Sequence, residues 1–157
     1  MTNEEIRRPA GVVIRFSMPS DVEVLFPIYR EVMRDYIEQT TGTWDEAEQR
    51  RQYVEGFPIG RAQVILVGYD IAGAIDCEHH GDRWTVNNIE IAPEWQNRGI
   101  GTWLRTRLLR QAHNEGIPVD LEVLKVNPAR GLYERLGFAV IGETDTHYLM
   151  SAAPTPR

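Results

Sequence analysis

The sequence predicts an α+β protein with a mixed, mostly antiparallel sheet of six to seven strands. Three strand-like runs follow one another between residues 63 and 91 with only short breaks, which is typical of an antiparallel meander. A strand, a glycine-containing turn, a helix and another strand then span residues 84–126, and a helical crossover of this kind joins parallel strands. The length of 157 residues suits one domain, so we expect a single domain over residues 1–157 with flexible ends at 1–10 and 152–157.

The chain before residue 60 predicts one strand and two helices. An apolar run over residues 12–16 indicates the strand. Ser20 and Glu23 have the spacing of a capping box, so we expect the first helix to begin at Ser20. Pro27 lies inside this helical pattern and is expected to kink the helix or to split off its first turn.

A second capping box predicts the next helix. Thr43 and Glu46 have the required spacing, and the helix is expected to run from about Trp44 to Gly56. Charged residues lie on most sides of this helix, so its apolar face is weak. We interpret it as a surface lid rather than a core element.

Runs of apolar residues between turn signals predict the remaining elements. The expected strands cover residues 63–69, 71–77, 84–91, 119–126, 138–141 and 147–150. A helix beginning at Ile100 is ended by Gly116, and Asn127-Pro128 is expected to cap a short helix that Gly137 closes.

Composition and charge exclude several classes of protein. The formal net charge of −6 argues against a nucleic-acid partner, because such proteins normally carry a basic patch. No apolar run has the length of a membrane span, and the single cysteine, Cys77, has no partner for an internal disulfide. We therefore expect a cytoplasmic protein with no nucleic-acid partner and no membrane association.

The segment from residue 89 to residue 102 organises the predicted fold. Pro93 ends a strand there, and a helical pattern begins at Ile100. The first N–H groups of a helix lack intrahelical partners, and their partial positive charge favours a phosphate group. Gly99 and Gly101 allow an anion to approach the backbone closely. The turn therefore predicts a binding site for a phosphate or pyrophosphate.

Two common phosphate-binding signatures are absent from this turn. A P-loop requires Gly-Lys-Ser/Thr after its glycines, and a dinucleotide fingerprint requires a third glycine where this chain has Leu104. Instead, residues 96–101 have the pattern Q-x-x-G-x-G. Downstream, Asn127 precedes a helix that carries Leu132-Tyr133-Glu134-Arg135-Leu136-Gly137-Phe138. In this order the two patterns resemble the signatures of the GCN5-related N-acetyltransferase (GNAT) superfamily, most strongly from residue 88 to residue 138.

The resemblance implies a fold and an activity. The fold would be the three-layer acyl-CoA N-acyltransferase fold, with helices on both faces of the sheet and a splayed central parallel strand pair. The cofactor would be acetyl-CoA, and the activity would be transfer of its acetyl group to a primary amine of a small molecule or peptide. The amine would attack directly in a ternary complex, and the protein would be a monomer or a homodimer.

The resemblance also implies the cofactor contacts. The pantetheine arm would lie where residues 89–92 and 119–123 separate, and a backbone N–H near Ile91 would polarise the acetyl carbonyl. The cofactor-binding residues would be Ile89, Ile91, Ala92, Gln96, Asn97, Arg98, Gly99, Ile100, Gly101, Thr102, Asn127, Arg130 and Tyr133.

Tyr133 is also expected to be the general acid that protonates the departing thiolate. With pKa values of about 8.5 for a thiol and about 10 for a phenol, this transfer is uphill by only roughly 2 kcal/mol. The general base is left open among Glu122, Glu90 and His147, in that order, with a water chain as a further alternative. Glu122 stands where the resemblance to ribosomal-protein N-terminal acetyltransferases places the base.

The sequence does not identify the acceptor amine. The resemblance places the first two helices beside the acceptor, so Tyr29, Tyr36 and Trp44 are expected either to be core residues or to line its site with His147. Residues 20–60 and 138–150 carry both acidic and basic groups and indicate no charge preference.

Two further predictions concern metal binding and catalysis. His79 and His80 are adjacent on a predicted strand and would point to opposite faces, so we expect no metal site. The alternative to an enzyme is a non-catalytic acyl-CoA-binding regulatory module, and a nucleotide-binding regulator is a third possibility. Tyr133 favours the enzyme, because a sensor needs no proton donor at the sulfur.

Overall fold

The computed structural model describes residues 7–155, so the expectation of flexible ends falls in part outside the described residues. Ala152, which we included in the flexible C-terminal end, is instead the buried last residue of a strand. The elements are β1 (Val12–Phe16), η1 (Pro19–Asp21), α1 (Val22–Thr41), α2 (Glu46–Gly56), β2 (Gln63–Val67), β3 (Asp70–His79), β4 (Trp84–Ile91), η2 (Pro93–Trp95), α3 (Ile100–Asn114), β5 (Val119–Leu124), α4 (Arg130–Arg135), β6 (Ala139–Glu143) and β7 (His147–Ala152).

Seven strands form one sheet in the order β1-β2-β3-β4-β5-β7-β6. All neighbouring pairs are antiparallel except β4 and β5, which α3 connects as a parallel crossover. The predicted meander, the crossover and the mixed sheet are therefore confirmed. The strand bounds differ from the prediction by a few residues, mostly because hydrogen bonding rather than hydrophobicity decides where a strand ends.

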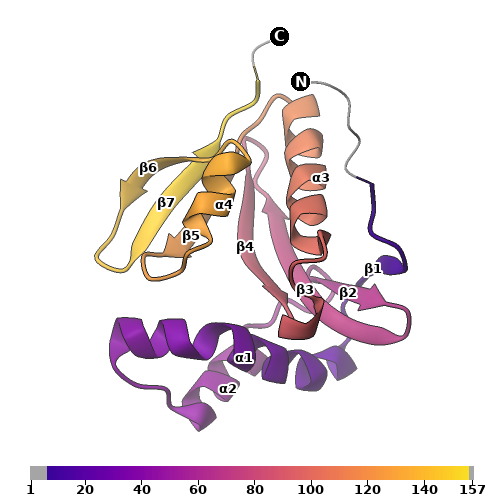
Figure 1. Ribbon diagram of the computed structural model, residues 1–157, viewed down its shortest axis with the longest axis vertical. Helices are drawn as coiled ribbons and strands as arrows, with labels where there is room; N and C mark the ends of the chain where they lie inside the picture. The colour runs from indigo at the N-terminus through magenta and orange to yellow at the C-terminus, as the bar shows by residue number, and fades with distance from the viewer. Residues whose placement is uncertain (1–6, 156–157) are drawn as a thin grey trace.

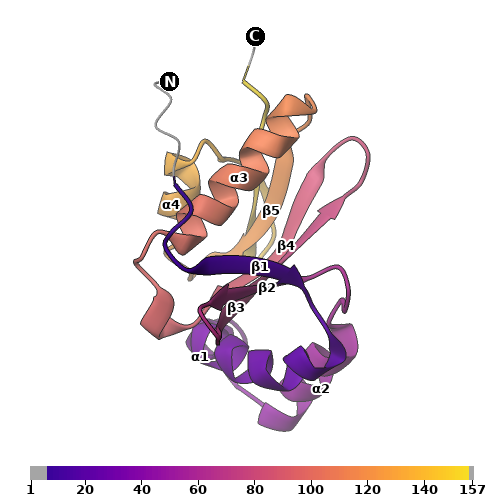
Figure 2. The same ribbon diagram turned by 90° about the vertical axis from the view of Figure 1, so that its right-hand side faces the viewer.

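The helices cover the two faces of the sheet unequally (Figures 1 and 2). α1 and α2 pack on one face of β2–β4, where Leu25 and Ile28 contact Val64 and Ala74. α3 and α4 pack on the opposite face, and α3 alone extends from the core of β1–β3 to that of β5 and β7. Within the described part of the chain, the face of β5 and β7 opposite α3 carries no helix (Figure 1), which leaves that part of the sheet open.

The parallel pair β4–β5 is joined along only part of its length. Its ladder begins at Trp84 opposite Val119 and ends at Val86 opposite Leu121. Beyond this point the two strands diverge (Figure 1). Asn87 has no partner in the β3–β4 register, where Asp76 pairs with Asn88 and the next pair skips to Val86, so a β-bulge lies at the split. The splayed strand pair is thereby confirmed, and peptide groups of β4 and β5 face each other without a ladder between them.

Two helices begin later than the capping boxes predicted. α1 begins at Val22, after the 3-10 turn η1, because the Asp21 carboxylate accepts hydrogen bonds from the Met18 N–H at 2.7 Å and from Arg15 at 2.8 Å. Ser20 therefore does not cap the helix. α1 also continues through Pro27 as one element.

The N-cap of α2 is Asp45 rather than Thr43. The Asp45 side chain accepts the Glu48 N–H at 3.1 Å, and α2 begins at Glu46. The interpretation of α2 as a surface helix agrees with its own residues, none of which is buried. Its Tyr53 is partly buried against the core beneath α1.

α4 also begins later than predicted, at Arg130, with Ala129 as its N-cap. The Asn127 side chain still stabilises the preceding turn, because its Oδ1 accepts the Ala129 N–H at 2.9 Å. Asn127 therefore shapes the approach to α4 without being the cap itself.

Gly73 on β3 provides a test of how closely the sheet is packed beside the split. A Cβ on Gly73 would lie 1.9 Å from the Glu90 carbonyl oxygen and 3.0 Å from the Ile91 Cα, both of which are backbone atoms. We expect Gly73→Ala to lower the unfolding free energy by roughly 3 kcal/mol or more, because the strands must move apart. Urea unfolding measures this loss.

The matched control for Gly73 is Gly142→Ala on β6, where the Cβ would meet only the Leu149 side chain at 3.3 Å. This variant is expected to stay within about 1 kcal/mol of the parent. Equal stability of the Gly73 and Gly142 variants would contradict the backbone approach at Gly73.

Candidate active site

The turn before α3 has the backbone conformation that an anion site requires. Gly99 is the N-cap residue with φ 83°, and Asn97 has φ 60°, so both lie in the left-handed region. No side chain caps the first turn of α3. Its N–H groups are therefore available to a ligand, and the positive end of the helix dipole adds to their attraction for an anion.

A cavity of about 490 Å³ opens at this turn and extends to α4. We call it the loop cavity. It brings together most of the predicted cofactor contacts, which come from β4, the turn, the start of α3 and the start of α4. Its predicted lining residues are Ile89, Ile91, Gln96, Asn97, Gly99, Ile100, Gly101, Thr102, Asn127 and Tyr133.

Three predicted cofactor contacts lie outside the loop cavity. Ala92 is buried, and its N–H donates to the Ala72 carbonyl at 2.7 Å. The Arg98 guanidinium lies 4.9 Å from the centre of the Trp95 ring. Arg130 donates to Glu134 at 2.7 Å and stacks on the Tyr148 ring. Both arginines contact other side chains and neither lines the cavity, which sequence spacing could not predict.

Tyr133 is buried in the loop cavity and is only 7% exposed. Its ring packs edge-on against Phe138 with the centroids 5.6 Å apart. The hydroxyl accepts a hydrogen bond of 3.3 Å from the Arg105 Nη2. The fold therefore holds a phenol beside the cavity in one orientation, with its hydroxyl near a positive charge.

Glu90 is the most deeply buried carboxylate of the site, at 1% exposure. The Tyr53 hydroxyl donates to its Oε1 at 2.7 Å, and the Asn88 side-chain amide donates to its Oε2 at 2.8 Å. Burial raises the pKa of Glu90 to about 7, and the two hydrogen bonds limit that rise. Glu90 lines a second cavity, of about 390 Å³, beneath α1 and α2, which we call the lid cavity.

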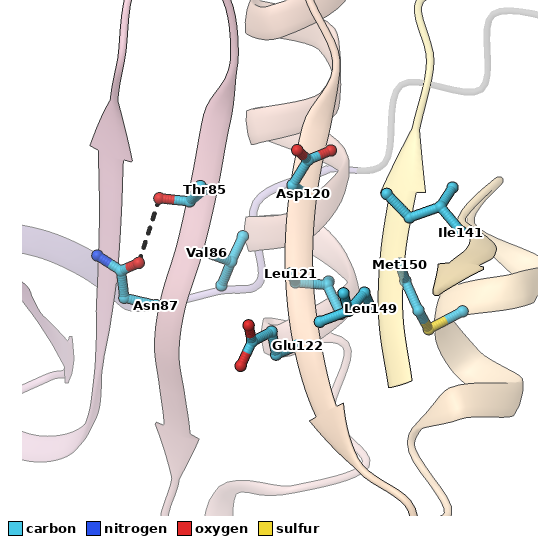
Figure 3. A pocket seen from close by; sticks show the side chains of 9 residues that line it. All are labelled: Thr85, Val86, Asn87, Asp120, Leu121, Glu122, Ile141, Leu149 and Met150. Atoms are coloured by element: carbon cyan, nitrogen blue, oxygen red, sulfur yellow. Dashed lines mark hydrogen bonds between the residues drawn. The ribbon is translucent and has the colours of Figure 1, made fainter. Parts of the chain in front are cut away.

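Glu122 lies in different surroundings on β5. Its side chain is exposed, and within residues 7–155 it forms no hydrogen bond or ion pair. It lines a third cavity, of about 440 Å³, on the open face of the sheet, and its carboxylate points toward β4 (Figure 3). We call this the open-face cavity. Asn87, the bulged residue of β4, lines both the lid cavity and the open-face cavity, so the two adjoin at the split.

The predicted acceptor-side residues are distributed among several sites. Tyr29 lines the lid cavity, where burial raises the pKa of its hydroxyl, and Tyr36 lines the loop cavity instead. Trp44 packs against Tyr29 with the ring centroids 6.4 Å apart and lines none of the three cavities. His147 begins β7, outside these cavities, and its Nδ1 lies 2.7 Å from the Thr146 hydroxyl.

Three residues of the site were missed by sequence reasoning. Arg105 follows Gly101 by one helical turn, so the helical period could have placed it on the face of the loop. Asn88 precedes Glu90 by two residues on a strand, which places both side chains on one face. Tyr53 comes from α2 and gave no signal, because its contact with Glu90 bridges elements 37 residues apart.

The histidines and the cysteine take part in other contacts. His79 lies 2.8 Å from Glu115, and His80 lies 2.9 Å from the Thr85 hydroxyl. Burial raises the pKa of the Cys77 thiol to about 12, so this cysteine is not a thiolate at neutral pH. Across residues 7–155, no group of three or more His, Cys, Asp or Glu side chains could hold a metal ion, and no helix is long and apolar enough to cross a membrane.

The fold and the site together define the class of protein. It is an α+β protein in which a parallel strand pair separates beside an uncapped helix start, with a tyrosine in the same cavity. The chain belongs to the GNAT acetyltransferase family, whose model matches residues 28–138. The resemblance inferred from the two sequence patterns is thereby confirmed.

Individual relatives are more distant. The chain is 35% identical over 85 residues to the [ribosomal protein bS18]-alanine N-acetyltransferase of Haemophilus influenzae, covering 54% of this chain and 58% of that protein. It is 33% identical over 129 residues to the mycothiol acetyltransferase of Thermobifida fusca, covering 73% of this chain and 39% of that protein. The chain therefore spans less than two thirds of the length of these curated relatives.

Solved structures share the fold at low sequence identity. The PaiA N-acetyltransferase of Thermoplasma acidophilum, in complex with coenzyme A, has a TM-score of 0.69 at 18% identity, covering 90% of this chain and 98% of that one. The ribosomal-protein-S18-alanine N-acetyltransferase of Escherichia coli has a TM-score of 0.62 at 21% identity, covering 93% of this chain and 96% of that one.

Proposed function

We propose that this protein is an acetyl-CoA-dependent N-acetyltransferase that acts on a primary amine of a small molecule or peptide by direct attack in a ternary complex. One observation carries the proposal. Alternate residues of β4 line two different cavities, with Ile89 and Ile91 in the loop cavity and Asn88 and Glu90 in the lid cavity. One strand therefore separates an anion-binding site from a buried carboxylate, which is the arrangement that acyl transfer between two substrates needs.

The loop cavity fits acetyl-CoA in charge and in shape. The free N–H groups at the start of α3 suit the diphosphate, and the unpaired edges of β4 and β5 suit the amide groups of the pantetheine arm. Arg105 adds a positive charge beside Tyr133. The relative from Thermoplasma acidophilum was solved with coenzyme A, which supports the same class of ligand here.

The proposed reaction uses Glu90 and Tyr133 in complementary roles. As the amine nitrogen bonds to the acetyl carbon, Glu90 accepts a proton from nitrogen, directly or through one water. As the bond from carbon to sulfur breaks, Tyr133 donates its hydroxyl proton to the sulfur. A free amine has a pKa of about 10, so a base is needed near neutral pH. A carboxylate with a pKa of about 7 is suited to this task.

The cavities beside the split favour an acceptor that arrives as a cation. Among residues 7–155, no Lys, Arg or His lines the lid cavity or the open-face cavity, whereas four carboxylates do. Arg61 pairs with Asp76 at 2.8 Å, and Asp120 accepts a hydrogen bond from Ser151 and lies 3.7 Å from the Arg83 guanidinium. Glu90 and Glu122 remain without a cationic partner within the described residues. The two cavities are therefore lined by acidic side chains, whereas residues 20–60 and 138–150 as sequence segments carry both acidic and basic groups.

Free-thiol release from acetyl-CoA with a pooled panel of amines tests the proposed function. The names of the relatives suggest two arms for the panel, a peptide that presents the amine of an alanine and amines related to mycothiol. We expect turnover in at least one pool. Tight coenzyme A binding without turnover in any pool would favour the non-catalytic regulatory module instead.

Tyr133→Phe tests the general acid in the same assay. We expect kcat to fall roughly 10- to 100-fold, because the thiolate must then leave without a positioned proton donor. The KM for acetyl-CoA is expected to change less than about threefold, since the ring keeps its packing on Phe138. An unchanged kcat would remove Tyr133 from the mechanism while leaving the transferase function in place.

A further inference from the structure

Arg105 occupies a position between the anion-binding turn and Tyr133. Its Nη2 lies 3.3 Å from the Tyr133 hydroxyl oxygen, and its Cζ lies 5.0 Å from the centre of the Tyr133 ring. A Cβ on Gly101 would lie 2.6 Å from the Arg105 Nη1. The guanidinium therefore lies over Gly101, and a larger residue at position 101 would require the guanidinium to shift.

Arg105 lacks the partners that usually accompany a guanidinium. Within residues 7–155 it forms no ion pair with a carboxylate, and its Nε is buried without a hydrogen-bond partner. Its only hydrogen bond in this part of the chain goes to the Tyr133 hydroxyl. Leaving a donor and a charge uncompensated costs stability, so packing alone does not explain this arginine.

We propose that Arg105 is a positioning residue that orients the Tyr133 hydroxyl for proton donation. A guanidinium has only donors, so the Tyr133 oxygen must accept the hydrogen bond and its own O–H must point elsewhere. The loop cavity is the open direction, and the thiolate would form there. The inference rests on the proposed function, in which Tyr133 is the general acid.

The Tyr133 O–H bond breaks, the proton bonds to sulfur, and the oxygen keeps the electron pair as a phenolate. The positive charge of Arg105, at hydrogen-bond distance, stabilises this phenolate until the oxygen regains a proton from water. The alternative role of Arg105 is to bind the diphosphate at the turn, and the two roles predict different kinetics.

A double-mutant cycle separates the two roles. Arg105→Met keeps the length of the side chain and removes its donors and charge, and we expect it to lower kcat at saturating acetyl-CoA roughly tenfold. Calorimetry is expected to show coenzyme A affinity within about threefold of the parent. In the Tyr133→Phe background, Arg105→Met should cause no further loss of kcat, because the hydroxyl that it orients is gone. Arg105→Lys should recover most of the activity.

Arg107→Met is the matched control on the same helix. Arg107 is exposed, and its guanidinium lies 5.8 Å from the centre of the Trp103 ring, away from the loop cavity. Its loss is expected to leave kcat and affinity unchanged. If Arg105→Met does not fold, as judged by thermal melting, then Arg105→Lys in both backgrounds supplies the cycle, with a smaller loss of kcat that again disappears beside Tyr133→Phe.

Two outcomes would overturn the inference. The first is a double variant in which the kcat losses of Arg105→Met and Tyr133→Phe multiply. The second is a more than tenfold weaker coenzyme A affinity with kcat at saturation intact, which would make Arg105 a phosphate ligand. Failure of the proposed function looks different, because the parent protein itself would then release no thiol with any amine.

Discussion

Replacing Glu90 with Gln is expected to lower kcat roughly 100- to 1000-fold, with coenzyme A affinity unchanged within about twofold. Gln keeps the shape of the side chain, and its oxygen can still accept a hydrogen bond from Tyr53 or Asn88. It cannot accept a proton from the amine. Steady-state kinetics with the best acceptor from the panel measure the loss, and calorimetry measures the affinity.

The pH dependence of activity gives a second measurement on Glu90. A general base must be ionised, so the kcat of the parent is expected to rise with pH through about 7, the pKa to which burial raises this carboxyl. The residual kcat of Glu90→Gln should not show this rise near pH 7. A parent profile without any inflection near pH 7 would count against Glu90 as the base.

The stability of the protein should change with pH in the opposite direction. The folded-state pKa of Glu90 is about 7 and the ordinary value is 4.5, so between these pH values the folded state binds more protons than the unfolded state. Stability therefore falls as pH rises from 4.5 to 7, by about 3 kcal/mol for this group. Urea unfolding at pH 5 and pH 8.5 should show this loss in the parent and a smaller one in Glu90→Gln.

Glu122→Gln is the control that separates the two carboxylates. Glu122 is exposed on the open face, where it can attract a cationic acceptor (Figure 3). We expect its loss to raise the acceptor KM by about three- to tenfold with kcat within about twofold. If instead Glu122→Gln abolishes turnover and Glu90→Gln does not, the base is Glu122, which the sequence placed first among the candidate bases.

Gly101→Glu is expected to abolish measurable coenzyme A binding, with an affinity loss of more than about 100-fold while the protein stays folded. The new carboxylate would occupy the site of the anion and repel the diphosphate, and its Cβ would lie 2.6 Å from the Arg105 Nη1, the end of a flexible side chain that can shift. A carboxylate in the first turn of a helix is itself favourable, so thermal stability should be retained. Calorimetry with coenzyme A and a thermal melt check both expectations.

The matched control for Gly101 places the same charge elsewhere on α3. Gln111→Glu adds one negative charge on an exposed position ten residues further along, outside the loop cavity. It is expected to bind coenzyme A as the parent does, which removes net charge as an explanation. Normal affinity in Gly101→Glu would show that the diphosphate does not bind at this turn.

Local patterns in the chain were sufficient to predict the order of elements and the glycine-containing turn before α3. Pro93 cannot donate to a sheet ladder, and Gly99 and Gly101 lack a Cβ, so the effect of each on the backbone does not depend on distant contacts. Helix starts were predicted less well. Asp45 caps the Glu48 N–H in place of Thr43, whereas the Asp21 carboxylate binds Arg15 and the Met18 N–H and leaves the first turn of α1 without a side-chain cap.

The sequence by itself determined the fold family and the turn before α3, because both depend on backbone conformation and on short-range spacing. Only the tertiary structure distinguished Glu90 from Glu122. These two carboxylates look alike on their strands, yet α1 and α2 cover the face of β4 and no helix covers that face of β5. The pKa of a carboxyl group depends on the water it loses and the donors it gains. Here those donors include Tyr53, 37 residues away in the chain, which no local pattern specifies.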